Sequence, residues 1–531
     1  MSDQIFLYGA LGLYFAGMLL IGYFAYKRTS DHEDYMLGGR NLPSWVAAIS
    51  AGAADMSGWL VMGLPGAIYA AGLIEAWIAI GLTIGAYLNW LLVAPRLRAY
   101  TEVSRNSITI PSFFENRLRD TSRSLRIVSG LIILVFFTLY ISSGMVAAGV
   151  FFESSFNGDY LFGMLLVGGI TLLYTLFGGF LGASLTDVVQ GLMMVIALIV
   201  VPVAAVIAIG GLEETSTLIT ENAGEGFLSL LGGGAVTGGT FLAIASALAW
   251  GLGYFGQPHI IVRFMALRSP QEAKSARRIG ISWMVVSMFG AIISGLVGIA
   301  YMAQQGITLD NPETVVLLMS QTLLHPFVAG LVLAAVLAAI MSTVSSQLVV
   351  CSSALVEDLY KVVRKTPPSD KRLVLLGRLA VLVVAIIAII LAITPNDSIL
   401  GLVSFAWAGF GAAFGPIVLL SLFWRKLTNW GALAGMFVGA VTVFVWKALD
   451  TDLYELLPAF VFAFVAAVVV SLVTYTRNDD IEKEFTDAEA MLTAPRAAVG
   501  SARVGSQPSR RRTISPIQIG ANGEVQPGAV G

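Results

Sequence analysis

Charged residues are scarce in this chain: Asp, Glu, Lys and Arg make up 12% of its 531 residues, whereas 57% are hydrophobic. A soluble globule of this length needs more polar surface than that composition supplies. The 31 basic and 33 acidic residues nearly balance, so the net charge indicates neither nucleic acid nor an acidic partner. The shortage of charge instead predicts a protein that meets lipid over much of its surface.

Cysteine and histidine are also rare. The single cysteine, Cys351, excludes a disulfide within the chain and any site built from several thiolates. The three histidines, His32, His259 and His325, are too widely spread to indicate a metal site. The clustered acids or histidines and the large substrate loop that an intramembrane enzyme would need are not visible either. We therefore expect no enzyme, and nothing in the sequence indicates an obligate protein partner.

Long apolar runs fill the space between the few charged clusters. A membrane-spanning helix needs about 20 such residues. The first run follows Asp3 and precedes Lys27-Arg28, which is the reverse of a cleavable signal peptide, so we expect it to be retained. Thirteen spans are predicted, at residues 5–26, 43–70, 73–95, 127–152, 160–181, 187–211, 237–262, 279–303, 326–358, 374–394, 399–423, 431–449 and 453–475.

The basic residues test this count, because they stay on the cytoplasmic side during insertion. With the N-terminus outside, the inward segments hold 30 of the 31 basic residues, and only Lys447 lies at an outer end. A missed or extra span in the middle would scramble this sorting. The pattern therefore favours an odd number of spans across the plasma membrane, with the N-terminus outside and the C-terminus in the cytoplasm.

The predicted organisation has four parts. Residues 1–42 hold the first span and a cytoplasmic loop, 43–423 a core of ten spans, and 424–476 two added spans. From about Asp479 the chain becomes charged and then rich in Gly, Pro, Ser and Arg, so residues 477–531 are expected to be a largely disordered cytoplasmic tail.

Two of the spans contain residues that break helices. The second reads AISAGAADMSGWLVMGLPGAIYA, with Asp55 and several glycines in its middle, and the seventh reads AIASALAWGLGYFGQPHIIVRF, with three glycines before Pro258. Helix breaks at membrane depth persist only where protein or a water-filled cavity satisfies the freed backbone groups. Each interrupted helix therefore predicts a site.

The two broken spans are also five spans apart. Because five is odd, the second group of five crosses the membrane in the opposite sense to the first. This is the inverted-repeat plan of secondary transporters, which bind substrate near the midplane between two discontinuous helices. The fold class predicted is an all-α polytopic membrane protein with a 5+5 inverted-repeat core.

Asp55 is the one acid in the middle of an apolar run of this kind. Placing it there costs about 2.5 to 3.5 kcal/mol on insertion scales, so a partner or a function has to offset the cost. It could hold a cation directly, or it could cap the inner half-helix by accepting backbone N–H groups at the break. Both alternatives place Asp55 beside the site.

Further polar and aromatic residues lie in span nine and near the two breaks. Span nine carries Ser342-Thr343-Val344-Ser345-Ser346, and hydroxyls together with freed carbonyls are oxygen ligands that suit a hard monovalent cation. Aromatic residues near the breaks would give a small ring-shaped solute flat apolar walls with polar edges. These aromatic residues are Trp59, Tyr140, Trp250 and Tyr254.

At these positions the sequence resembles the sodium:solute symporter family, over about residues 5–475 and most closely its proline-carrying bacterial branch. The resemblance rests on HEDYMLGGR (32–40), SAGAADMSGWLVMGLPGA (50–67), SLTDVVQ (184–190), AWGLGYFGQPHIIVRFMA (249–266) and LAAIMSTVSSQLVVCSSALVEDLY (337–360). It implies a leucine-transporter-like core in spans two to eleven and sodium-coupled uptake of L-proline by alternating access, with Na+ as the co-transported ion.

The resemblance also implies roles for single residues. Sodium would be held by Ala53, Met56, Ala339, Ser342 and Thr343, and proline by Trp59, Tyr140, Trp250, Tyr254 and Pro258. Ion coupling would involve Asp55, Ser57, Asp187 and Arg40, with Asp187 on the cytoplasmic exit path of the ion.

Some alternatives stay open at this point. Asp187 could instead be the N-cap of span six together with Thr186. The coupled ion could be a proton, and the solute another small amino acid or a carboxylate. A nutrient sensor built on a transporter core is a further possibility, although about 50 residues of tail are too few for a soluble signalling domain.

Overall fold

The chain is helical throughout the part that the structure describes. The computed structural model describes residues 2–28, 37–234, 236–361, 369–395 and 397–493. Because lipid offers no hydrogen-bond partners, a spanning segment has to satisfy its own backbone groups, and a helix does so. Within these ranges the only strand-like pairing is an isolated parallel bridge between Leu42 and Leu267.

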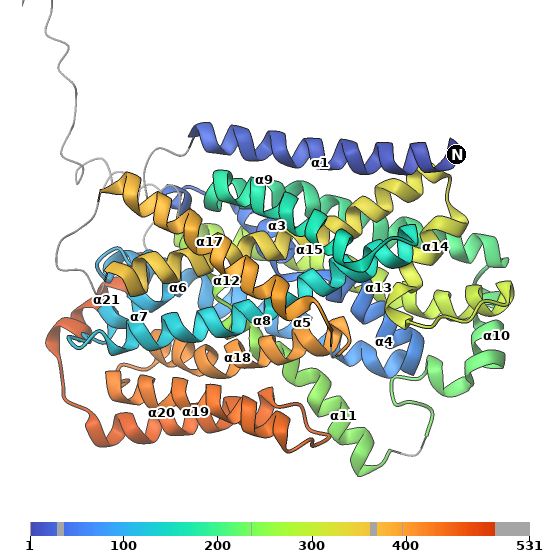
Figure 1. The fold of residues 1–531 in the computed structure, drawn as a ribbon. Coiled ribbons are helices and arrows are strands. Elements are labelled where there is room, and N and C mark those ends of the chain that lie inside the picture. Colours follow the sequence, from blue (N-terminus) through green and yellow to red (C-terminus); the bar gives the residue numbers. More distant parts are fainter. Residues whose placement is uncertain (1, 29–36, 235, 362–368, 396, 494–531) are drawn as a thin grey trace, which may run out of the picture. The chain divides into compact units, whose positions relative to one another are not determined.

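The helices and helical turns follow one another in a single packed unit, residues 1–492 (Figure 1). Their bounds are α1 Ser2–Arg28, η1 Gly38–Arg40, α3 Ser44–Asp55, η2 Trp59–Gly63, α4 Leu64–Ala71, η3 Leu73–Glu75, α5 Ala76–Leu88, η4 Asn89–Val93, α6 Ala94–Val103, α7 Ile110–Arg117, α8 Ser124–Phe156, α9 Tyr160–Ile209, α10 Leu212–Ala223, η5 Glu225–Leu228, α11 Gly238–Ala249, η6 Trp250–Gly256, α12 Pro258–Met265, η7 Pro270–Glu272, α13 Ala273–Gln305, η8 Pro312–Thr314, α14 Val315–Leu323, α15 Pro326–Ser353, η9 Ala354–Tyr360, α17 Asp370–Ala392, α18 Ile399–Phe423, α19 Asn429–Ala448, α20 Leu456–Thr474 and α21 Asp479–Thr493.

The predicted spans correspond closely to these helices. Among the described residues, 11 helices are long and apolar enough to cross a membrane, and a twelfth span results when the bent pair Ser44–Asp55 and Trp59–Ala71 counts as one. The remaining predicted stretch, 160–181, coincides with a shorter apolar helix, Tyr160–Leu176. The prediction of an all-α polytopic membrane protein is confirmed.

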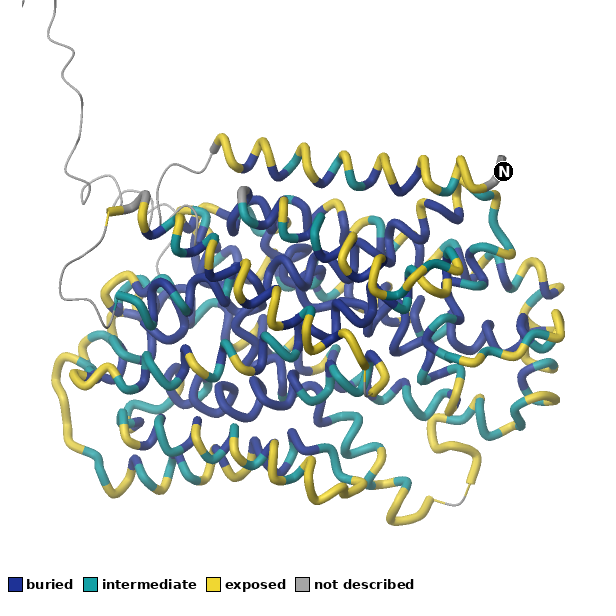
Figure 2. Tube along the Cα trace, viewed as in Figure 1, coloured by how far each residue is buried: buried dark blue, intermediate teal, exposed yellow. Residues whose placement is uncertain are grey.

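Helix α15 lies in the interior of the bundle, where α1, α8 and α9 pack against it. Of its most apolar window, 83% is buried, against 28% for α1. Figure 2 shows exposed residues along the outward faces of α1, α19 and α20, while the middle of the bundle is buried. The exposed apolar residues of the outer helices form the surface that faces lipid.

Spans five and six differ in detail from the prediction. A kink at Gly179, where φ is 55° and ψ is −154°, divides helix α9, and only glycine adopts such a backbone readily. No loop separates the spans at residues 182–186, so Asp187 lies well inside the second half of α9. Thr186 accordingly bonds back to the carbonyl of Gly182 at 3.0 Å. The alternative that Asp187 is an N-cap is therefore wrong.

The expectation of a disordered tail is also wrong over residues 479–493, which form α21. Three acidic residues in its first turn favour the helix through its dipole. Phe485 and Ala488 are buried, and Glu484 pairs with Arg119 at 2.8 Å. Packing and pairing thus order a segment whose charge alone indicates disorder. Residues 494–531, including the Arg510-Arg511-Arg512 cluster, lie outside the described residues.

Candidate functional site

The first break interrupts the second span between α3 and α4. Helix α3 ends at Asp55, and the two halves of the span are bent by 64°. The carbonyl of Asp55 is freed by this bend and accepts the indole N–H of Trp59 at 3.0 Å and the backbone N–H of Ser57 at 3.0 Å. Protein groups therefore satisfy the freed backbone at this depth, as the sequence predicts.

The predicted sodium ligands on α3 and α15 lie next to each other. The hydroxyl of Ser342 donates to the carbonyl of Ala53 at 2.7 Å, although 289 residues separate them in sequence. The Ser342 and Thr343 hydroxyls lie 3.0 and 3.4 Å from the carbonyl of Ala339. Met56, the fifth predicted ligand, is the C-cap residue that directly follows α3. This is a buried cluster of neutral oxygens, the donor set that a hard monovalent cation favours.

Asp55 reaches across to the second broken span. Its carboxylate accepts a short hydrogen bond from the hydroxyl of Tyr254, and both side chains are buried. Its other oxygen, Oδ1, has no hydrogen-bond partner among the described residues. The side chain is thus not used as a cap for the inner half-helix. The two discontinuous helices are instead joined through this contact.

The second break is the 3-10 turn η6, followed by Gln257 and by Pro258 at the start of α12. Two of the carbonyls in η6 accept hydrogen bonds from side chains of other elements. The indole N–H of Trp407 donates to the carbonyl of Trp250 at 2.8 Å, and the amide of Asn89 donates to that of Tyr254 at 2.9 Å.

The predicted aromatic residues lie around both breaks. The rings of Trp59 and Trp250 are 6.5 Å apart between centroids, so the two broken spans also touch through aromatic rings. Tyr140, on α8, packs edge-on against His259 at 5.9 Å, next to Pro258. All are buried. The predicted aromatic residues thus lie near one another, and His259 lies among them without having been predicted.

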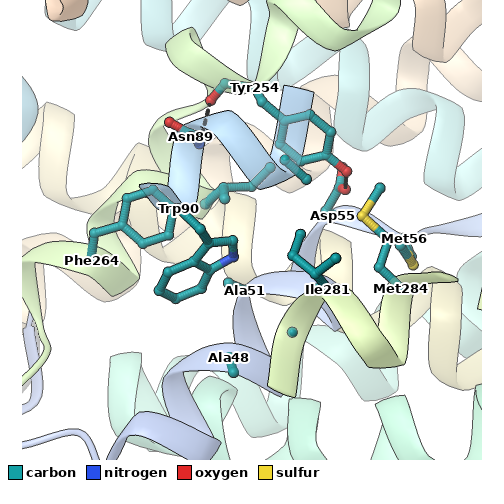
Figure 3. A pocket seen from close by; sticks show the side chains of 14 residues that line it. Ala48, Ala51, Asp55, Met56, Asn89, Trp90, Tyr254, Phe264, Ile281 and Met284 are labelled. Atoms are coloured by element: carbon teal, nitrogen blue, oxygen red, sulfur yellow. Dashed lines mark hydrogen bonds between the residues drawn. The ribbon is translucent and has the colours of Figure 1, made fainter. Parts of the chain in front are cut away.

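A small cavity lies on the α3 side of the first break. Figure 3 shows Asp55 and Tyr254 touching at its edge, with Asn89 and Trp90 from the second core helix on the opposite wall. Of the predicted residues, only Asp55, Met56 and Tyr254 line this cavity; the other predicted aromatics and Pro258 do not. The apolar floor comes from helix α13, including Ile281 and Met284.

Arg40 holds the segment before α3 against two other elements. Its guanidinium donates to Thr101 Oγ1 at 3.1 Å, to Asn106 Oδ1 at 2.9 Å and to the carbonyl of Met265 at 2.9 Å. The backbone N–H of Leu42 donates to the carbonyl of Ala266 at 3.0 Å. Arg40 thus joins the starting end of α3 to the ends of α6 and α12.

Asp187 forms a buried ion pair with Arg263 on α12, with 2.9 Å between Oδ2 and the guanidinium nitrogen. Ser50 donates to the same carboxylate oxygen at 2.7 Å, and Arg263 also donates to Ser346 at 2.6 Å. Four elements, α3, α9, α12 and α15, therefore meet at one charge pair. These contacts link the four elements. Separating Asp187 from Arg263 would leave a buried charge uncompensated, which opposes any movement that pulls the elements apart.

Sequence reasoning missed Arg263, Asn89 and Trp407. Arg263 was counted only as a cytoplasmic basic residue, yet its side chain is 1% exposed. A basic residue five positions after Pro258, inside an apolar run, is a signal that would have identified it. Asn89 and Trp407 lie in spans without a break, and no local pattern marks them.

The sequence is similar to those of known proteins over most of its length. Residues 35–439 match the model of the sodium:solute symporter family. The chain is 56% identical to the high-affinity proline transporter PutP of Bacillus subtilis, covering 90% of this chain and 100% of that protein. It is 52% identical to the osmoregulated proline transporter OpuE of the same organism, and 49% to a sodium/proline symporter of Staphylococcus aureus, covering 96% and 92% of those proteins.

Solved structures support the fold. A substrate-bound, outward-open Na+-coupled sialic acid symporter superposes with a TM-score of 0.75 at 20% identity, covering 89% of this chain and 99% of that one. A nucleobase-cation-symport-1 family transporter superposes with a TM-score of 0.50 at 14% identity, covering 85% and 98%. At these identities the likeness concerns the arrangement of helices alone.

Proposed function

The chain belongs to the sodium:solute symporter family, and we propose that it is a membrane transporter that couples the inward movement of sodium to the uptake of L-proline. The observation that carries the proposal is the contact between Ser342 and Ala53 at 2.7 Å. It brings hydroxyls of α15 to carbonyls that the bend in the second span exposes. The extent of the similarity to proline transporters, over 90% of the chain, supports proline as the solute.

In this proposal sodium is held between the two elements that meet there. Its ligands are the carbonyls of Ala53, Met56 and Ala339 and the hydroxyls of Ser342 and Thr343. A sodium ion at this position draws α3 and α15 together, and Asp55 and Ser57 follow directly on the same break. Asp187, on α9, is joined through Arg263 to Ser346, which lies one turn beyond Ser342 on α15, and it takes part in the release of the ion toward the cytoplasm.

Proline occupies the region between the two breaks in the same proposal. Trp59, Tyr140, Trp250, Tyr254 and Pro258 enclose its ring. A carboxylate is favoured at the N-terminal end of a half-helix, where free N–H groups and the helix dipole attract negative charge. Because each ligand binds best while the other is bound, the sodium gradient drives uptake.

The orientation and the division of the chain belong to this proposal as well. The N-terminus lies outside and the C-terminus inside, supported by the 30 of 31 basic residues on inward segments. Residues 43–423 are the moving core, with one span before them and two after. Arg40 then acts at the cytoplasmic end of the core.

Uptake of radiolabelled proline into proteoliposomes tests the proposal. We expect an inward sodium gradient to raise the initial rate strongly, and unlabelled proline to compete better than other amino acids. The Thr343→Ala variant should need more sodium for half-maximal uptake, with proline binding at saturating sodium little changed. If uptake does not depend on sodium, the assignment of sodium as the coupled ion is wrong. If another solute competes better than proline, the assignment of proline as the substrate is wrong.

A further inference from the structure

The turn η6 exposes more backbone than a regular helix does. Its seven residues, Trp250–Gly256, leave the hydrogen-bond ladder of α11 before α12 begins. Trp250 and Tyr254 within this turn belong to the proposed proline site, and the backbone conformation of the turn sets the directions of their side chains. The orientation of both rings therefore depends on what holds the carbonyls of η6.

Trp407 of α18 holds the first of these carbonyls. Its indole N–H donates to the carbonyl of Trp250 at 2.8 Å, and its ring stacks on Trp250 at 6.5 Å and meets Tyr254 edge-on at 5.1 Å. The amide of Gln257 donates to the carbonyl of Trp407 at 3.1 Å, so backbone and side chain are both fixed. Trp407 is 1% exposed.

The fit between Trp407 and the turn leaves no spare space. A Cβ added to Gly253 would lie 1.9 Å from Nε1 of Trp407. Glycine at this position thus allows the indole to reach the backbone of η6 directly. The close approach indicates that the turn and this ring are matched to each other rather than merely neighbours.

Asn89 holds the second carbonyl from the opposite side. Its amide donates to the carbonyl of Tyr254 at 2.9 Å, and its side chain is fully buried beside the cavity of Figure 3. A neutral side chain at this depth is costly unless it is hydrogen-bonded. The contact across two elements, η4 and η6, pairs the amide N–H of Asn89 with the freed carbonyl, while Oδ1 of Asn89 has no hydrogen-bond partner among the described residues.

We propose that Trp407 and Asn89 are positioning residues for substrate selection, which clamp η6 from both sides and thereby set the directions of the Trp250 and Tyr254 rings. This inference rests on the proposed function, because it concerns the site at which proline would bind. Neither residue needs to touch the solute. Loss of either donor leaves a buried carbonyl unpaired, so the turn relaxes and the shape of the pocket becomes less exact.

The test measures proline uptake in proteoliposomes at saturating sodium, with the amount of reconstituted protein determined for each variant. Trp407→Phe keeps an aromatic ring but loses the N–H donor. We expect its KM for proline to rise about tenfold, with turnover at saturating proline retained. Discrimination against pipecolate, the homologue with a six-membered ring, should weaken.

Trp446→Phe is the matched control. The indole of Trp446 on α19 also donates to a backbone carbonyl, that of Leu453, at 3.1 Å, but it lies outside the proposed core. Its KM and its selectivity should stay as in the unaltered protein. Asn89→Leu supplies a second test of the clamp, which decides the matter if Trp407→Phe does not yield folded protein.

The outcomes distinguish a wrong proposed function from a wrong role for Trp407 and Asn89. If the unaltered protein does not take up proline, the proposed function is wrong. If it does, and Trp407→Phe and Asn89→Leu keep its KM and selectivity, the clamp is wrong. A fall in turnover alone, or an equal change in Trp446→Phe, indicates a structural role and also overturns the inference.

Discussion

Removal of the Ser342 hydroxyl perturbs the proposed ion site most directly. In Ser342→Ala the bond to the Ala53 carbonyl at 2.7 Å is lost, together with one of the proposed sodium ligands. A hydrogen bond to a charged group contributes about 1.5 to 3 kcal/mol, and a neutral oxygen ligand lost from a buried cation should cost a similar amount, which corresponds to roughly 10- to 150-fold in an equilibrium constant. We expect the sodium concentration for half-maximal proline uptake to rise within this range.

The assay is initial proline uptake into proteoliposomes over a series of sodium concentrations at constant ionic strength. Proline uptake at saturating sodium should approach that of the unaltered protein, because sodium then restores the contact between α3 and α15. The effect thus separates a lost ion ligand from a damaged fold, which would lower uptake at every sodium concentration.

Ser294→Ala is the control for loss of a buried hydroxyl. Ser294 on α13 is fully buried and bonds back to the carbonyl of Gly290 at 2.7 Å, within its own helix. Its sodium dependence should be unchanged. An unaltered sodium requirement in Ser342→Ala, or an equal shift in Ser294→Ala, would refute the reasoning.

Three further changes test the packing around the site. In Gly256→Ala the new Cβ would lie 2.2 Å from the carbonyl oxygen of Phe410, so we expect the free energy of unfolding to fall by about 1 to 3 kcal/mol. Size-exclusion chromatography should then show little folded protein. Gly169→Ala, where a Cβ meets nothing within 4 Å, is the control and should behave as the unaltered protein does. Burial raises the pKa of Glu313, and two backbone N–H bonds from α18 offset part of this rise. Because the folded protein holds the proton more tightly than the unfolded chain, stability falls as pH rises from the ordinary pKa of Glu through the raised one. Glu313→Gln should remove this part of the pH dependence of stability, so identical pH profiles of the melting temperature in the variant and the unaltered protein would contradict the prediction. Phe485→Ala should release α21, seen as faster proteolysis within residues 479–493 at unchanged sodium dependence; unchanged protection would contradict the packing of this helix.

Much of the fold could be predicted because lipid imposes simple rules on sequence. Apolar length marks the spans, and glycine, proline and a buried acid mark the two breaks, at Asp55 and before Pro258. The kink at Gly179 was not predicted, since a glycine pair within an apolar run also suits a plain helix. The position of Asp187 was misjudged for the same reason.

Contacts between distant elements were beyond sequence reasoning. Nothing local links Asp55 to Tyr254, or Asp187 to Arg263, because each pair joins separate spans whose approach depends on the packing of the whole bundle. The helix α21 could have been found. Ile481, Phe485, Ala488 and Leu492 recur at helical spacing, but the surrounding charge dominated the interpretation.

The two halves of the proposed site share one short segment, and this sharing has a consequence for coupling. Residues 53–56 supply the carbonyl that meets Ser342 and, two positions on, the carboxylate that meets Tyr254. Ala53 and Asp55 lie in the last turn of α3, so a movement at one of these contacts also moves the other. If sodium binds at the proposed site on the α15 side, it therefore changes the geometry on the η6 side, where Tyr254 is also held by Asn89. Coupling free energies between sites are typically about 1 to 3 kcal/mol, and the loss of one or two such hydrogen bonds is enough to account for a value of that size. Because the N–H of Ser57 donates to the carbonyl of Asp55 and not to that of Ala53, the break leaves the Ala53 carbonyl available to Ser342, only two residues from the carboxylate that meets Tyr254.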